Sequence, residues 1–111
     1  MIHIITSRAT KRELAEMLDR WGNFVKLAVD VQMGILAGGG EWHTDCETVL
    51  LNEGSRQENI WGASRTPVSG FIDYDSVINL RPRQKHFSMQ VQDPLVRDRI
   101  AEVIRDLLEG V

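Results

Sequence analysis

Two stretches of the chain repeat apolar residues at the spacing of an amphipathic helix. Thr10 and Glu13 before the first stretch have capping-box spacing, and Gly22 after it supplies a left-handed stop. The second stretch begins at Asp93-Pro94, with aspartate as N-cap and proline in the first turn, and Gly110 ends it. The apolar stripes are Leu14, Met17, Leu18 and Trp21 in the first, and Val96, Ile100, Val103, Ile104, Leu107 and Leu108 in the second.

Short strands are predicted between the helices. From Phe24 to Val31 apolar and polar residues alternate, which is typical of a half-buried strand. Apolar runs at 2–5, 35–37 and 77–80 indicate further strands, the last ended by Pro82, and 89–91 reads as a brief extended piece. Pro67, Gly70 and the two serines of 63–74 predict a surface loop.

The segment from His43 to Leu51 fits two structures. Thr44-Asp45-Cys46-Glu47 has capping-box spacing, which would start a short helix ended by Gly54. Glu47-Thr48-Val49-Leu50-Leu51 is instead strand-like, and the following Asn52-Glu53-Gly54 suits a hairpin turn. We favour the hairpin, which pairs Asp45 with Trp61. One of its faces would carry His43, Asp45, Glu47, Asn59 and Trp61, and the other Cys46, Leu50 and Ile60.

These elements predict one α+β domain over residues 1–111. We expect a largely antiparallel sheet of five or six strands, with the two main helices packed on one face. A chain of 111 residues is long enough to bury a core without disulfides or metals.

Composition narrows the class of protein. No apolar run approaches the roughly 20 residues of a membrane span, and no secretory signal precedes the first strand, so no membrane partner is expected. The single cysteine excludes an internal disulfide and predicts a cytoplasmic location. A net charge of −3 argues against general nucleic-acid binding.

The densest set of possible metal ligands is His43, Asp45 and Glu47. Alternate residues of a strand project together, so on a strand these three, with His86 as a further candidate, could hold a divalent metal for hydrolysis. The spacing matches no established ligand motif. A solvated strand end is the more ordinary interpretation, so no cofactor is expected and a divalent metal is the alternative.

Cys46 also has two interpretations. A thiol beside His43 or His86 could act as a nucleophile. Its predicted neighbours Leu50 and Ile60 favour a small buried hydrophobe, which is the common fate of a free cysteine.

One basic segment could bind anions or nucleic acid through Arg81, Arg83 and Lys85. It has only Phe87 beside it, and nucleic-acid surfaces usually interleave several aromatic rings, so a solvated loop is favoured. Trp42 and Trp61 are flanked by polar residues, and half-exposed tryptophans are frequent at contact surfaces.

The sequence leaves the question of enzymatic activity open and favours a non-catalytic binding or interaction module. Its expected contact surface consists of Trp42, His43, Asp45, Trp61, Arg81 and Arg83. An exposed edge strand would also allow a homodimer.

Several segments of the chain resemble a small bacterial family catalogued as a domain of unknown function. The likeness lies in Gly38-Gly39, His43, Asp45, Leu50-Leu51, Gly54-Ser55, Gln57, Trp61-Gly62 and Ile78-Asn79-Leu80-Arg81-Pro82. It extends over most of the chain, including both helices. The resemblance implies a free-standing bacterial cytosolic domain and draws attention to residues 38–62 as the segment of functional interest. It implies no activity, cofactor or catalytic residue.

Overall fold

A five-stranded antiparallel sheet in the order β1-β3-β2-β4-β5 forms the centre of the molecule. The computed structural model describes all 111 residues and has the α+β class that the sequence predicts. The elements are β1 (His3–Ile5), α1 (Lys11–Met17), β2 (Val25–Asp30), β3 (Ile35–Gly38), α2 (His43–Asn52), β4 (Ile60–Arg65), β5 (Ile72–Asp73) and α3 (Pro94–Leu108). Single 3-10 turns occur at Gln57–Asn59, Val77–Asn79 and Pro82–Gln84.

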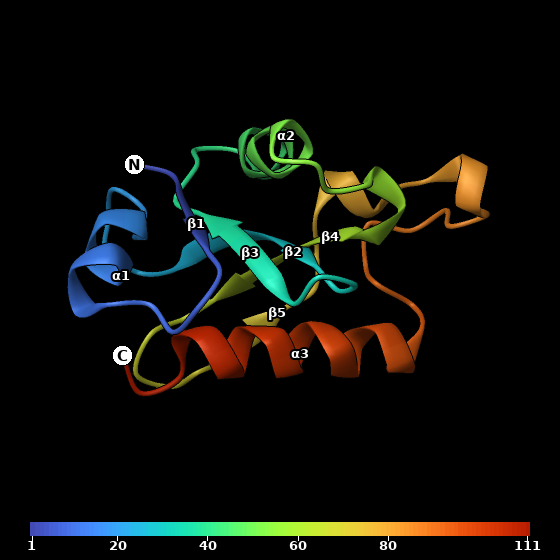
Figure 1. Cartoon of the computed structure of the whole chain (residues 1–111). Helices are drawn as coiled ribbons and strands as arrows, with labels where there is room; N and C mark the ends of the chain where they lie inside the picture. The colour runs from blue at the N-terminus through green and yellow to red at the C-terminus, as the bar shows by residue number, and fades with distance from the viewer.

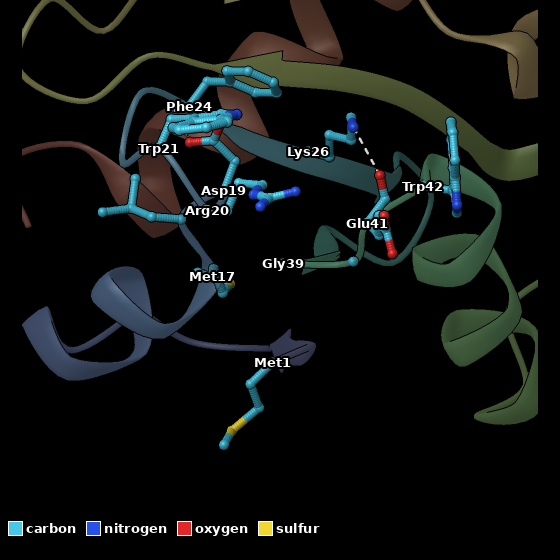
Figure 2. Close-up of a pocket in the computed structure, with 12 residues that line it drawn as sticks. Met1, Met17, Asp19, Arg20, Trp21, Phe24, Lys26, Gly39, Glu41 and Trp42 are labelled. Carbon is cyan, nitrogen blue, oxygen red and sulfur yellow. Dashed lines mark hydrogen bonds between the residues drawn. The ribbon is translucent and has the colours of Figure 1, made fainter.

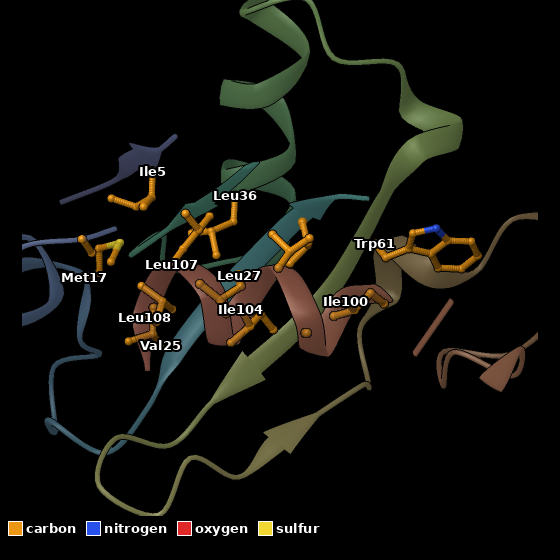
Figure 3. Close-up of a cluster of buried hydrophobic side chains, with 14 of the residues drawn as sticks. Ile5, Met17, Val25, Leu27, Leu36, Trp61, Ile100, Ile104, Leu107 and Leu108 are labelled. Carbon is orange, nitrogen blue, oxygen red and sulfur yellow. The ribbon is translucent and has the colours of Figure 1, made fainter. Parts of the chain in front are cut away.

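The sheet is covered on both faces. The two predicted main helices, α1 and α3, share one core cluster with Leu27 and Leu36 of the sheet, as predicted. Figure 3 shows Leu27 and Ile104 among the side chains buried between the sheet and α3. On the opposite side, α2 places Cys46 and Leu50 on a second cluster, and Figure 1 shows α2 and α3 on either side of the sheet. The strand expected at 24–31 is confirmed as β2, but its half-burial is wrong, because Ala28 and Asp30 on the face expected to be polar are also fully buried.

The hairpin expected at 43–61 is also wrong, because His43–Asn52 is a helix. Cys46 and Leu50, four residues apart, both reach the sheet from one helical face. The position expected for Asp45 opposite Trp61 is taken by Val29 of β2. The buried cysteine confirms the packing interpretation of Cys46, and burial raises the pKa of its thiol.

The first helix begins as predicted and ends early. Thr10 and Glu13 form the capping box, but the helix stops at Met17. Trp21 therefore lies beyond the helix and is 72% exposed, which corrects its assignment to the core stripe. The last helix has the predicted cap, with the Asp93 side chain accepting from the amide of Leu95.

The region after β4 differs most from expectation. Residues 63–65 continue β4 and 72–73 form β5, where a loop was expected, and the strand expected at 77–80 is a 3-10 turn. This turn carries Asn79 against the edge of β4 that the two-residue β5 leaves open. Its side chain accepts from the amide of Gly62 at 2.8 Å and donates to the Gly62 carbonyl at 3.0 Å, as a neighbouring strand would.

The close approach at this edge requires a glycine. A Cβ at Gly62 would lie 2.4 Å from the side chain of Ser76, far inside contact distance.

None of the helices combines the length and the apolar content needed to cross a bilayer.

Candidate functional site

A groove of about 690 Å³ lies between the α1–β2 connection and the β3–α2 connection. We call it the aromatic groove. Its lining residues are Met1, Met17, Leu18, Asp19, Arg20, Trp21, Phe24, Lys26, Gly39, Gly40, Glu41 and Trp42. Figure 2 shows Trp21 and Phe24 together on one side and Trp42 on the other, with Lys26 between them.

Exposed aromatic rings form the walls of the groove. Trp21 is exposed because α1 ends four residues before it. Trp42 is 63% exposed at the N-cap of α2, where its backbone is extended and its ring lies outside the helix. Large exposed rings beside a hollow are typical of contact sites, since their apolar area remains available for burial against a ligand.

Lys26 lies between the walls. It projects from β2 on the α2 face, and its ammonium nitrogen is 5.7 Å from the centre of the Phe24 ring and 5.6 Å from that of Trp42. The ammonium donates one hydrogen bond to the Glu41 carbonyl at 2.7 Å. An ammonium has three N–H donors, so two remain for other acceptors.

Three other charged residues line the groove. The Arg20 guanidinium stacks over the Trp21 ring at 5.0 Å. The Asp19 carboxylate accepts from the backbone amides of Asn23 and Phe24, so it holds the turn that presents Trp21. Neither Lys26 nor Arg20 has a carboxylate partner within salt-bridge distance. Likewise, neither Asp19 nor Glu41 has a cationic partner within that distance.

Gly39 allows one wall of the groove to approach the other. Its φ is +98°, a conformation that glycine adopts without steric cost. A Cβ there would lie 2.2 Å from the Met1 carbonyl oxygen and 2.8 Å from the Met17 Cα, so no other residue fits. The glycines at 38–40 thus allow the chain to turn so that Glu41 and Trp42 reach the groove.

A second hollow of about 300 Å³ adjoins the first and shares Phe24 and Lys26 with it. The strand register places Lys26 beside Ser64, and Ser64 beside Asp73, in one row across β2, β4 and β5. Phe71 and Thr66 complete the lining. The aromatic groove therefore continues into a smaller polar hollow at the ends of three strands.

His43 lies next to this row, but its side chain is hydrogen-bonded to the backbone. Its Nε2 lies 2.9 Å from the Ala63 carbonyl oxygen, which only accepts, so Nε2 carries the proton. The Ser64 hydroxyl is 3.5 Å from the same nitrogen and finds no lone pair there. The arrangement does not activate Ser64 as a nucleophile.

Burial lowers the pKa of His43 below its ordinary value of 6.5, and the Lys26 charge acts in the same direction. The hydrogen bond to Ala63 and the carboxylates of Asp73 and Asp75 oppose this shift. The folded state thus resists protonation that the unfolded chain accepts. Stability that is present above pH 6.5 is lost as the pH falls through the lowered pKa.

We expect a His43→Gln variant to lose less stability than the wild type between pH 7.5 and pH 5, because glutamine takes up no proton. Urea unfolding at both pH values measures the difference between the two proteins. If the unfolding free energies of wild type and His43→Gln depended equally on pH, the lowered pKa of His43 would not be a cause of the loss of stability.

The convergence expected for His43, Asp45 and Glu47 as metal ligands is wrong, because the three residues lie on a helix. On a helix, residues two apart point to opposite sides, so Asp45 faces away from the other two. Its carboxylate accepts from the amide of Trp42 and caps α2. No group of three or more His, Cys, Asp or Glu side chains lies close enough together to hold a metal ion, and His86 bonds elsewhere.

The six residues expected to form one contact surface are separated. Trp42 lines the aromatic groove and His43 lies beside it, but Trp61 and Arg81 are only 8% and 6% exposed. Trp61 was expected to be half exposed. It is instead a buried member of the core cluster between the sheet and α3. Arg83 is exposed on the 3-10 turn after Arg81.

Arg81 supports the fold from inside. Its guanidinium stacks on Trp61 at 4.2 Å and donates to the carbonyls of Ile78 and Gln57. Burial lowers its pKa, and burial likewise raises the pKa of Glu47, which faces it without direct contact. The basic segment therefore offers only Arg83 and Lys85 to an anion or nucleic acid.

Sequence reasoning missed most of the groove. Trp21 fitted the apolar stripe of the first helix, and Lys26 fitted the solvent side of a half-buried strand. The available signals were Asp19, whose side chain can cap a turn, and the two tryptophans placed just outside helices.

Comparison of the chain with known proteins identifies a family, but that family has no described function. A family model described as "Protein of unknown function (DUF5674)" matches residues 3–107. No curated protein and no solved structure matches the chain.

Proposed function

Because this chain belongs to the DUF5674 family, whose description states no function, we propose its function from its own geometry. The protein is a binding module that holds an organic ligand with a flat apolar part in the aromatic groove. The observation that carries this proposal is the pair of exposed tryptophans, Trp21 and Trp42, on opposite walls of this groove.

Burial of the walls supplies the binding energy. Each indole presents apolar area that a flat ligand would remove from water, at roughly 25 cal/mol per Å². Stacked aromatic pairs add about 0.5–1.5 kcal/mol beyond that area. The backbone on both sides is fixed, by the Asp19 turn on one wall and by the close approach of Gly39 on the other.

Binding is favoured over catalysis by the chemistry of the lining. The groove contains no serine, threonine, cysteine or histidine. Two residues near the groove could in principle act as a nucleophile or a base, Cys46 and His43. Cys46 is buried and His43 donates its proton to a backbone carbonyl, so neither is available to a ligand. The polar groups that remain are charged side chains suited to orienting a ligand.

N-phenyl-1-naphthylamine, an uncharged flat probe, tests the proposal by the fluorescence it gains on leaving water. We expect saturable binding to the wild type and a loss of about tenfold in affinity for Trp42→Ala. Phe87→Ala is the matched control, because Phe87 is also a strongly exposed aromatic residue but does not line the groove. Unchanged affinity in Trp42→Ala, or absence of binding to the wild type, would refute the groove as a binding site.

The proposal includes a bacterial cytosolic setting. It is supported by the bacterial family that the sequence resembles and by the single cysteine, which is buried and has no disulfide partner.

A further inference from the structure

We infer that the natural ligand of the aromatic groove carries an anionic group, such as a carboxylate, sulfonate or phosphate, on its flat apolar body. The inference rests on the proposed function and goes beyond it, since it names the charge of the ligand. Its basis is the position of the two cations in the groove relative to the aromatic rings.

A resident cation lies against each of the aromatic rings. Lys26 lies within 6 Å of both the Phe24 and the Trp42 ring centres, and Arg20 stacks on Trp21. A cationic ligand would bind these rings through the same electrostatic attraction. It would therefore compete with side chains already in place and be repelled by them, so the groove selects against positive charge.

The cations remain available to an anion. Lys26 keeps two N–H donors after its bond to the Glu41 carbonyl, and no carboxylate pairs with Lys26 or Arg20. Stacking fixes their positions, which lowers the entropy that an incoming anion would have to remove. A sulfonate or carboxylate beside Lys26 would gain a charge-assisted hydrogen bond.

Two acids also line the groove, and they act differently. Asp19 accepts from the amides of Asn23 and Phe24, so its charge is engaged with the turn. Glu41 makes no side-chain hydrogen bond and is the charge that opposes an anionic ligand. Removing Glu41 and removing Lys26 should therefore change the affinity for an anion in opposite directions.

The test compares two probes with the same flat body, N-phenyl-1-naphthylamine and its sulfonate, 8-anilinonaphthalene-1-sulfonate. We expect the wild type to bind the sulfonate about tenfold more tightly than the uncharged probe. Lys26→Met should bring the two affinities within about twofold of each other while binding of the uncharged probe persists, which shows that the groove still folds. Glu41→Gln should raise the affinity for the sulfonate about two- to threefold.

Arg83→Met is the charge-matched control, since it removes one exposed positive charge outside the groove. Equal affinity of the wild type for both probes would overturn the anionic ligand and leave the proposed function standing. A tenfold preference that survives in Lys26→Met would overturn the role of Lys26 as the partner of the anion. Failure of both probes to bind would overturn both the anionic ligand and the proposed function.

Discussion

An Asn79→Ala variant is expected to lose about 3 kcal/mol of unfolding free energy, because it removes the partner of several buried polar groups at once. The Asn79 side chain is fully buried and bonds both the amide and the carbonyl of Gly62. Its amide nitrogen also lies within hydrogen-bond distance of the carbonyls of Tyr74 and Met89. Alanine leaves the Gly62 amide without a partner and without access to water. Urea unfolding followed by circular dichroism measures the loss.

Asn52→Ala provides the control for this variant. Asn52 is exposed at the end of α2 and its side chain makes no hydrogen bond within the protein, so a change below about 0.5 kcal/mol is expected. Asn79→Asp separates shape from bonding, since it keeps the volume and loses the two N–H donors. It should be at least as destabilising as alanine. A loss of less than 1 kcal/mol in Asn79→Ala would mean that the edge of β4 does not depend on this amide.

A Leu50→Ala variant is expected to lose about 3 kcal/mol, within the range of 2–5 kcal/mol for leucine truncated in a core. Leu50 is fully buried and contributes to the cluster beneath α2, which contains only six buried residues. A cluster this small has few neighbours that can move to fill the space left by the removed atoms. The measurement is again urea unfolding, read at the midpoint and the slope.

The adjacent Leu51 is the matched control, with the same chemistry on the other side of the helix. Leu51 is exposed, so Leu51→Ala should cost less than about 1 kcal/mol. Equal losses in the two variants would show that α2 does not pack as described. The pair thus tests whether Leu50, and not Leu51, packs against the sheet.

The parts of the fold that were predictable carry their own local signals. Both main helices have side-chain caps and an apolar stripe, and local hydrogen bonds decide where they begin. The strand at Val25–Asp30 was recognised from its alternation, but the burial of its second face was not. Ala28 and Asp30 give no sign of burial in the sequence, because alanine is neutral and Asp30 is buried only through bonds to the turn at 32–33 and to Ser55.

The helix α2 was missed because its sequence is weakly amphipathic. Only Cys46 and Leu50 are fully buried in it, and its threonines and valine favour strands when considered alone. The contact with the sheet decides its structure, and that contact involves residues distant in the chain. The capping interpretation of this segment was the one closer to the structure, although Trp42 rather than Thr44 occupies the N-cap.

The candidate site was only partly predictable for the same reason. Trp42 was identified from its polar flanks, whereas Trp21, Phe24 and Lys26 join it only when the chain brings 19–26 next to 39–42. Trp61 and Arg81 show the reverse case. Their polar neighbours suggested a surface, yet the two side chains stack on each other inside the protein.

The amide of Asn79 has a consequence for how copies of this protein behave toward one another. The terminal strand β5 reaches only Ser64 and Arg65, so the remainder of β4 would otherwise present unpaired backbone groups. Unpaired sheet margins of this kind recruit other chains and seed fibrils. A single planar side chain bonds to Gly62 where a full additional strand would normally lie, so the amide and carbonyl of this residue are not free to pair with another chain.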